Sequence, residues 1–468
     1  MKRAYTYALI AICAVASSFT MNAINGFPAG TSVEQELLPD GGAYADRHVE
    51  RGLLLLREGT LGDEREPFLG GFARGPIEAG FIALAFLLFG ERMWSLWALQ
   101  MLFFVFACWF LYGVSIRYLG ERWGLAPALM LALFWGSSLY VFNINNEIWS
   151  LFFITGAGYA LVRWYESGSV RWLGVAGCAL SLLVLAKPIF EYMLPVAVVL
   201  IFLHATYSGG RWRQAVIPTL VFTGMLVLLV GGWHVRNVLV LGTYKISAGG
   251  HALLIRAKTA EYPPRVAAGF FVSSVFGDYV ADKIFPGFAD LNEPRETIRE
   301  IFNRRRPELR IAGMTEFETD ELFFKEASGI IRAHPIGYFA VAPAWFFRLN
   351  SPPRYNGGMM ERLFVDTYQE IPASIKIMGL LSVHLVWLAF VGAVFWKGFY
   401  WLTGMRRRAS FEAWVVLFIG YTNAAYALLA HAEVRYLLVV MPFYFLLFTI
   451  FLKDRVEWVI AKKQIIAL

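Results

Sequence analysis

Residues 75–90 have the sequence Gly-Pro-Ile-Glu-Ala-Gly-Phe-Ile-Ala-Leu-Ala-Phe-Leu-Leu-Phe-Gly, an apolar stretch barely long enough to cross a lipid bilayer. The stretch opens with Pro76 after its first glycine and has an ionisable side chain, Glu78, within its first turn. A helix needs about 20 apolar residues to span the hydrocarbon core, and a charged group at that depth is costly. The stretch is therefore either a short span or a helix lying on the membrane surface, and this choice orients every later span.

The composition shows that most of the chain faces lipid. The 468 residues are 58% hydrophobic and 16% charged, with a mean hydropathy of +0.53. A single soluble core cannot bury so much apolar surface, so the sequence predicts an all-α polytopic membrane protein with about ten transmembrane helices. We expect these spans at residues 4–24, 93–116, 124–142, 148–165, 172–186, 188–206, 215–234, 375–400, 411–430 and 434–452.

The distribution of Lys and Arg decides between the two interpretations of residues 75–90. Short cytoplasmic loops are enriched in these residues. If residues 75–90 lie along the outer surface, the short basic connections and both termini fall on the cytoplasmic side, whereas a span there would put several of them outside. We therefore predict a juxtamembrane helix at residues 75–90. The first span has an alternative interpretation as a cleaved signal peptide, because it follows the basic start Met1-Lys2-Arg3.

This topology divides the chain into three regions. Apolar residues at helical spacing from Thr319 to Phe347, around His334-Pro335, predict amphipathic helices on the outer leaflet, with extra membrane helices as an alternative. The regions are an N-terminal membrane domain at 1–234 with an external loop at 25–92, a large external loop at 235–373, and a three-span segment with a cytoplasmic tail at 374–468.

Several functional classes are disfavoured by the residue pattern. The net charge of +7 comes from basic residues beside the spans, so it indicates orientation rather than nucleic-acid binding. All three cysteines lie within apolar runs, and no histidine pair has a ligand spacing such as His-x-x-x-His, so no metal site is predicted. No glycine-rich phosphate loop follows a strand, so no nucleotide or other cofactor is expected.

Costly polar residues gather at the predicted outer boundary of the membrane. Ionisable groups held at membrane depth are functional candidates because desolvating them without a partner is expensive. Any one of them has an ordinary structural explanation, but their common face indicates a site. They are Asp40, Arg74, Glu147, Lys187, Glu191, His234, Arg236, His431, Glu433 and Arg435.

Six patterns stand at this boundary, in chain order: Asp40-Gly-Gly-Ala-Tyr44, Phe72-Ala-Arg74-Gly-Pro76, Asn143 to Glu147, Leu185-Ala-Lys187-Pro188, Gly232-Trp-His234-Val-Arg236-Asn237 and Glu433-Val-Arg435-Tyr436. Together they resemble those of GT-C glycosyltransferases that use polyprenyl-phosphate sugars. The similar branch contains the protein O-mannosyltransferases and the lipid A aminoarabinose transferase. Two features depart from that family: Gly41 stands where it has a second acidic residue, and the spacing from Tyr44 to Gly59 is about one helical turn longer.

The resemblance implies sugar transfer, which has clear chemical needs. A carboxylate must take the proton of the attacking acceptor hydroxyl, and fixed cations must stabilise the leaving phosphate. We predict Asp40 or Asp46 as the base. A single in-line displacement would invert the anomeric centre. The phosphate-binding candidates are Arg74, Lys187, Arg236 and Arg435, and the substrate-binding candidates are Tyr44, Glu147, His234, His251 and Glu433.

Each of these residues also has a purely structural interpretation, which the sequence leaves open. Asp40 precedes two glycines and suits a turn, and Glu147 suits a helix N-terminus. Arg74 is spaced to pair with Glu78, whereas Lys187 and Arg236 suit snorkelling or headgroup contacts.

The leading hypothesis is a membrane glycosyltransferase that moves a sugar from a polyprenyl-phosphate donor to a protein, lipid or glycan acceptor outside the cytoplasm. We expect a multi-pass protein of a bacterial inner membrane, with the bilayer and no nucleic acid among its partners. One alternative is a transporter or flippase of a lipid-linked sugar, and another is a noncatalytic protein that binds lipid phosphate. Release of free polyprenyl phosphate from the donor would decide against both.

Overall fold

The computed structural model describes residues 2–25, 47–62, 75–209, 212–286, 297–298, 300–352, 372–404 and 411–466. Helices and short connections make up these residues, and no strand occurs among them. The fold is therefore all-α, as the sequence predicted. Six helical segments in the described part of the chain are long and apolar enough to cross a membrane: Arg3–Ile24, Met93–Leu133, Pro188–Tyr207, Trp212–Leu241, Ser374–Thr403 and Phe411–Leu428.

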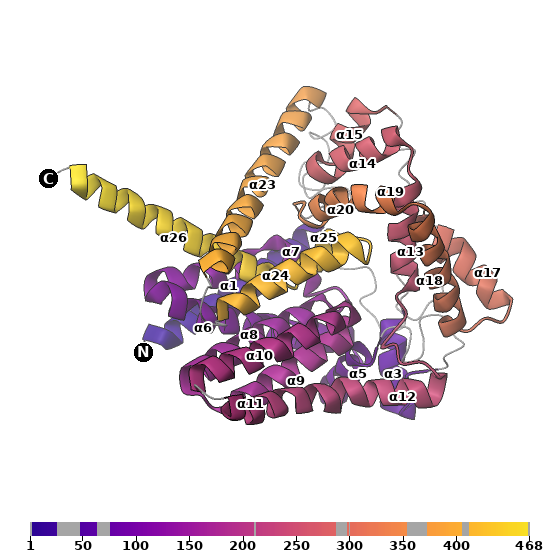
Figure 1. The fold of residues 1–468 in the computed structure, drawn as a ribbon, viewed down its shortest axis with the longest axis horizontal. Coiled ribbons are helices and arrows are strands. Elements are labelled where there is room, and N and C mark those ends of the chain that lie inside the picture. Colours follow the sequence, from indigo (N-terminus) through magenta and orange to yellow (C-terminus); the bar gives the residue numbers. More distant parts are fainter. Residues whose placement is uncertain are drawn as a thin grey trace.

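The N-terminal half forms a helical bundle at the lower left of Figure 1. α1 packs on α6, α6 packs on α8, and α8 packs on α9, so the bundle is built mainly from successive neighbours. Apolar side chains that remain exposed on these helices, such as Ile12, Leu203 and Leu220, suit contact with lipid. The helices are α1 (Lys2–Asn25), α6 (Met93–Leu133), α7 (Trp135–Tyr140), α8 (Glu147–Ser167), α9 (Val170–Ala186), α10 (Leu194–Gly209) and α11 (Trp212–Leu226).

α6 contains a sharp turn that separates two of the predicted spans. Gly120 has φ 73° and ψ 177°, which is outside the helical region and is open to glycine at little cost. On the two sides of the turn, Gly124 lies so close to Ile116 that an added Cβ would be 2.7 Å from its Cα. The long helix is thus two segments, divided within the predicted connection between residues 116 and 124.

The stretch at residues 75–90 forms α5 (Ile77–Phe89), which packs on α3 (His48–Glu58). Its 13 residues extend about 20 Å along the helix axis, which is less than the hydrocarbon thickness of about 30 Å. α3 and α5 approach closely because Gly52 has no side chain, and a Cβ there would collide with Ile82. A short helix is what the juxtamembrane interpretation requires.

The helix after α11 continues further than the sequence predicted. A π-helical turn, η2 (Val227–Gly231), joins α11 to α12 (Gly232–Leu241), so His234 and Arg236 lie inside a helix rather than at its exit. The helix ends where Gly242 adopts φ 68°, a left-handed C-cap conformation. The predicted end at residue 234 was early because the helix continues through the polar residues His234, Arg236 and Asn237 to Leu241.

Residues Gly250–Leu349 contain a second helical body, here called the α13–α20 domain, at the right of Figure 1. Helices form around His334-Pro335, as the sequence predicted, and the structure shows a break between them: α18 ends at Ala333 and α19 begins at Pro335. α18 begins with a capping box in which Thr315 and Glu318 satisfy backbone groups reciprocally. The helices of this domain are α13 (Gly250–Lys258), η3 (Thr259–Glu261), α14 (Pro264–Phe276), α15 (Asp278–Ile284), η4 (Glu300–Arg305), α17 (Arg306–Ile311), α18 (Glu316–Ala333), α19 (Pro335–Ala340) and α20 (Ala342–Leu349).

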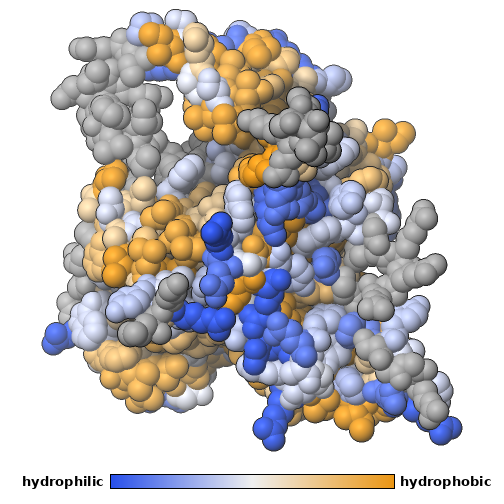
Figure 2. Space-filling model, turned by 90° about the vertical axis from the view of Figure 1, so that its left-hand side faces the viewer, coloured by the Kyte–Doolittle hydropathy of each residue, from blue (hydrophilic) through white to orange (hydrophobic). Residues whose placement is uncertain are grey.

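The C-terminal helices return to the bundle. α23 (Ala373–Gly404) and α24 (Phe411–Leu428) precede the short α25 (Val434–Leu437), and α26 (Met441–Ile466) packs on α6. Both chain ends lie at the left of Figure 1, away from the α13–α20 domain. Figure 2 views this side of the molecule and shows hydrophilic side chains gathered near its middle, with hydrophobic surface around them.

Candidate functional site

A buried ion pair joins the start of α8 to the end of α9. Glu147 is the first residue of α8, and Lys187 directly follows α9. Because these helices pack as neighbours, with a tight connection between them, the two residues meet at the same end. The Lys187 Nζ lies 3.2 Å from Glu147 Oε1, and the side chains are only 6% and 2% exposed. Lys187 therefore does not extend its ammonium group to open solvent.

A hydrogen bond between the two helix ends fixes the backbone around this pair. Asn146 Nδ2 donates to the Ala186 carbonyl at 2.8 Å and thereby ties the start of α8 to the end of α9. The second carboxylate oxygen of Glu147, Oε2, is buried and has no hydrogen-bond partner among the described residues. The pair is thus fixed in place with one acceptor atom unused.

A second charged group lies on α25 and the segment before it. Arg435 Nε is 2.6 Å from Glu433 Oε2, and His431 Nε2 is 3.4 Å from Glu433 Oε1. The hydroxyl of Tyr436 lies 3.3 Å from the same histidine nitrogen. A carboxylate, a guanidinium, an imidazole and a phenol therefore share one short stretch of chain.

Tyr436 connects the two charged groups. The Lys187 ammonium lies 5.0 Å from the centre of its ring, and the Arg435 guanidinium lies 5.2 Å from it, so both cations are within cation–π range. Tyr426 of α24 stacks on the ring at 4.7 Å. We call Glu147, Lys187, His431, Glu433, Arg435 and Tyr436 the Tyr436 cluster.

Opposite charges shift the ionisation of this cluster. Burial alone would raise the pKa of the Glu433 carboxyl, but Arg435 and His431 hold that pKa well below its usual range. Arg348 of α20 acts in the same direction, so the α13–α20 domain adds positive potential to the site. Burial lowers the pKa of the Lys187 ammonium, and the charge of Glu147 opposes this effect. Glu433 is consequently a stable anion, whereas Lys187 is a cation that loses its proton more easily than a free lysine.

Four of the predicted site residues, Glu147, Lys187, Glu433 and Arg435, meet in the Tyr436 cluster. The sequence placed His431 among the candidates at the outer boundary without giving it a role, and it missed Tyr436 as a site residue, although Tyr436 stood in the quoted Glu433-Val-Arg435-Tyr436 pattern. It also missed Arg348, because nothing in its local sequence indicates that it faces Glu433. Only packing of α20 against α24 and α25 creates that proximity.

Three other predicted residues have different surroundings. His234 Nε2 lies 2.9 Å from Glu191 Oε1, and its Nδ1 contacts the Tyr244 carbonyl. Arg236 donates to Asn237 Oδ1 at 2.8 Å and lies over the Trp233 ring. His251 packs edge-to-face on Phe302 within the α13–α20 domain, with ring centres 5.3 Å apart.

The pattern around His234 has a clear structural role. Asn237 Nδ2 donates to the carbonyls of Lys245 and Ile246 at 2.7 and 3.1 Å. The indole nitrogen of Trp233 also donates to Ile246, at 3.1 Å. The side chains of α12 thus hold the connection that leads into the α13–α20 domain.

Asp40, Tyr44, Asp46 and Arg74 lie outside the described residues. The described chain resumes at Gly75, whose backbone lies against the Leu185 carbonyl: an added Cβ would be 2.6 Å from that oxygen. Arg51 Nη2 donates to the Gly75 carbonyl at 2.6 Å. The start of the α5 segment therefore contacts the end of α9, two residues before Lys187.

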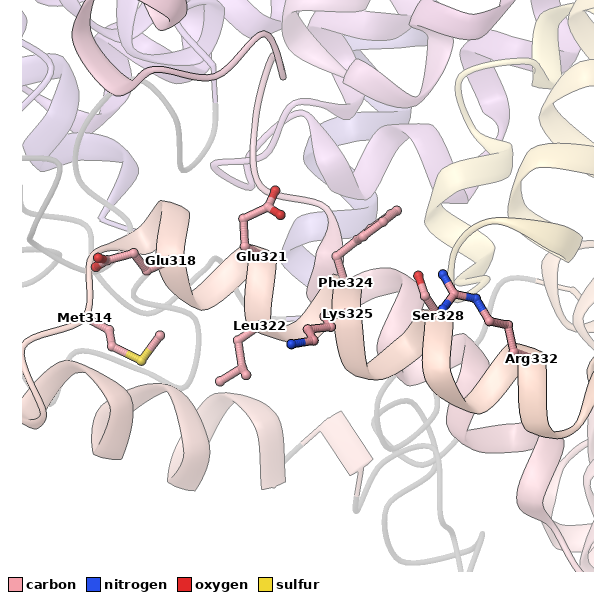
Figure 3. A pocket seen from close by; sticks show the side chains of 8 residues that line it. All are labelled: Met314, Glu318, Glu321, Leu322, Phe324, Lys325, Ser328 and Arg332. Carbon is pink, nitrogen blue, oxygen red and sulfur yellow. The ribbon is translucent and has the colours of Figure 1, made fainter.

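A hollow of about 510 Å³ lies along α18, away from the predicted residues. Figure 3 shows that its side chains point in different directions: Glu321 and Phe324 project to one side of the helix and Leu322 to the other. Glu321 already pairs with Lys245. The hollow is therefore a poor candidate for a catalytic site. Among the described residues, no group of three His, Cys, Asp or Glu side chains could hold a metal ion.

Comparison with protein families agrees with the resemblance predicted from the motifs. Residues 73–233, about a third of the chain, match the family described as dolichyl-phosphate-mannose-protein mannosyltransferase. This range includes Glu147 and Lys187 but ends before Glu433. The match supports a membrane glycosyltransferase. No curated protein matched the chain.

Similar solved structures include the oligosaccharyltransferase of the archaeon Archaeoglobus fulgidus. One of these structures is in complex with an inhibitory peptide and a dolichol-phosphate. It is 13% identical to the present chain with a TM-score of 0.48, and the match covers 99% of the present chain and 52% of the oligosaccharyltransferase chain. Another, in complex with zinc and sulfate, is 14% identical with a TM-score of 0.48, and covers 97% and 51%. The present chain thus spans about half the length of these proteins.

Proposed function

We propose that this protein is a membrane glycosyltransferase that moves a sugar from a polyprenyl-phosphate donor to an acceptor on the extracytoplasmic face. The observation that supports it most strongly is the Tyr436 cluster, in which two cations are held beside carboxylates at one end of the bundle. The family match across residues 73–233, a range that includes Glu147 and Lys187, supports a membrane glycosyltransferase.

In this proposal Lys187 and Arg435 bind the donor phosphate. Negative charge grows on the phosphate as the bond to the sugar breaks, and preorganised cations in a site with little water stabilise that charge. Glu147 and Glu433 balance the two cations before the donor arrives, which limits the cost of keeping them buried. Glu147 Oε2, which is buried without a partner in the described structure, suits a sugar hydroxyl as its donor.

The proposed transfer is a single displacement. The acceptor oxygen attacks the anomeric carbon, the bond from that carbon to the phosphate oxygen breaks, and the configuration inverts. Asp40 or Asp46 takes the acceptor's proton, while the leaving polyprenyl phosphate retains the bonding electrons. We propose Tyr44 and Arg74 as neighbours of the base and the phosphate.

We place the site on the extracytoplasmic side of a bacterial inner membrane. Both chain ends lie at the side of the molecule away from the α13–α20 domain, which supports a topology with the termini on one face and this domain on the other. The Lys and Arg residues of the short connections favour a topology in which both termini are cytoplasmic. The acceptor is a protein, lipid or glycan on the opposite face.

The test uses purified full-length protein in detergent with a panel of polyprenyl-phosphate sugars. Mass spectrometry follows both loss of each donor and release of polyprenyl phosphate. Lys187→Met should abolish release, whereas Lys397→Met should retain it, because Lys397 is also largely buried but pairs with Asp454 elsewhere. No release from any donor by the wild type, with transport of the intact donor across liposomes, would favour a flippase and overturn the proposal.

A second experiment addresses the base. Asp40→Asn and Asp46→Asn are prepared separately, and each rate of transfer is compared with the wild type. Loss of a general base lowers the rate by about 10²–10⁴-fold, so one variant should lose transfer and the other should retain it. Full activity in both would remove the carboxylate assignment.

A further inference from the structure

The C-terminus of α24 is completed by donors from another part of the protein. The last four carbonyls of a helix have no partner within it and need one elsewhere. Leu429 N–H donates to the Ala425 carbonyl at 2.7 Å, but the carbonyls of Ala427 and Leu428 accept from side chains of the α13–α20 domain. The chain then continues within a few residues to Glu433.

Arg256 of α13 is one of these donors. Its side chain is fully buried, and its Nε donates to the Ala427 carbonyl at 2.9 Å. Its two other nitrogens donate to the Tyr338 carbonyl at 2.8 Å and to Thr259 Oγ1 at 3.1 Å. These acceptors are neutral, so the guanidinium is stabilised by the negative end of the α24 dipole and by the Tyr338 ring, 4.2 Å away.

Tyr338 of α19 is the second donor. Its ring lies under the Arg256 guanidinium, and its hydroxyl donates to the Leu428 carbonyl. One planar guanidinium and one phenol thus hold two successive carbonyls at the end of α24. Lysine could not reproduce this arrangement, because it lacks the rigid fork of donors that reaches three acceptors at once.

The same domain contacts the segment that follows α24. α20 packs on α24 and on α25, the helix that contains Arg435. The positions of Glu433 and Arg435 therefore depend on how the α13–α20 domain sits on the end of α24.

We propose that Arg256 and Tyr338 are positioning residues for the donor site: they hold the end of α24 so that Glu433 and Arg435 stay beside Lys187 and Tyr436. This inference rests on the proposed function, because it takes Arg435 to be a phosphate-binding residue. It adds that the α13–α20 domain determines whether the membrane bundle can bind the donor.

The test measures binding of undecaprenyl phosphate to full-length protein in detergent micelles by native mass spectrometry. Tyr338→Phe removes a single hydroxyl and should weaken binding about 3- to 10-fold, the equivalent of one hydrogen bond. Arg256→Lys should weaken it more, by about 10-fold or above, because it loses the fork as well. Arg306→Lys is the matched control, since Arg306 is also a buried arginine of this domain but pairs with Glu316.

A double-mutant cycle separates positioning from general damage. If Tyr338 acts through Arg435, Tyr338→Phe should cause no further weakening in an Arg435→Met background. Equal weakening in both backgrounds would overturn the proposal, as would wild-type binding by Tyr338→Phe and Arg256→Lys. If both variants fail to fold while Arg306→Lys folds, the contacts are structural and the proposal also fails.

Binding of undecaprenyl phosphate by the wild type distinguishes failure of the proposed function from failure of the positioning role. If the wild type does not bind undecaprenyl phosphate at all, the proposed function fails, and the positioning role fails with it. If the wild type binds and the cycle is additive, only the positioning role fails.

Discussion

Replacing Lys187 by Met should destabilise the protein, and replacing Glu147 by Gln in the same chain should restore most of the loss. At 3.2 Å and an effective dielectric constant of about 20, the Coulomb attraction of this pair is about 5 kcal/mol. Most of that attraction offsets the cost of removing the two charges from water. Removal of one partner leaves the other charge buried and unpaired, which costs about 3–5 kcal/mol.

The double replacement removes both the attraction and the desolvation cost. We therefore expect Lys187→Met with Glu147→Gln to lie within about 1–2 kcal/mol of the wild type. Transfer should stay absent in both variants, because neither has Lys187, one of the two cations proposed to bind the donor phosphate. Stability and activity would thus be separated in one pair of proteins.

The assay is thermal unfolding in detergent, followed by intrinsic tryptophan fluorescence at matched protein concentration. Lys397→Met is the control, because its partner Asp454 is 51% exposed and can be hydrated after the substitution. It should cost less than Lys187→Met. A Lys187→Met variant as stable as the wild type, or a double variant that loses the sum of the two single losses, would refute the reasoning.

Three further predictions concern pH, the cluster's aromatic ring and a helix cap. The lowered pKa of Lys187 means that raising the pH through it should reduce transfer, and Lys187→Arg should move the loss of transfer to higher pH; a coincident alkaline limit in both proteins would contradict this. Tyr436→Phe keeps the ring beside both cations and should bind undecaprenyl phosphate within a few-fold of wild type, whereas Tyr436→Leu should bind it much more weakly; equal binding by the two variants would exclude the cation–π contribution. Thr315→Ala should cost about 1 kcal/mol of stability in thermal unfolding without changing undecaprenyl phosphate binding, because it removes only the cap of α18, and an altered donor affinity would count against this separation.

The membrane architecture follows from local sequence features. Apolar length, glycine and proline position, and the placement of Lys and Arg act over a few residues each, so they predict the all-α fold and the helices around His334-Pro335. Gly120 illustrates the limit of such signals: the basic loop around it predicted a connection, but only the structure shows that this glycine adopts the turn. The span was predicted to end at residue 234 because hydropathy falls at His234 and Arg236, but the helix continues to Leu241.

Part of the candidate site could also be predicted from the sequence. Glu147, Lys187, Glu433 and Arg435 are ionisable groups at span ends, where burial without a partner is costly, and they do meet as ion pairs. His234 and Arg236 carry the same signal, yet His234 pairs with Glu191 and the surrounding α12 side chains hold the next connection. A costly polar residue therefore indicates that a partner exists and leaves the identity of that partner open.

The sequence by itself determined that this protein is a polytopic helical membrane protein with charged residues at the ends of its spans. Only the tertiary structure decided that Lys187, after α9, lies beside the Tyr436 ring of α25. It also decided that Arg348 lowers the pKa of Glu433 and that Arg256 donates to a carbonyl at the end of α24. The physical reason is range. Hydropathy and charge bias act on neighbouring residues, whereas ion pairs, ring stacking and shared carbonyls depend on which helix ends are brought together by packing.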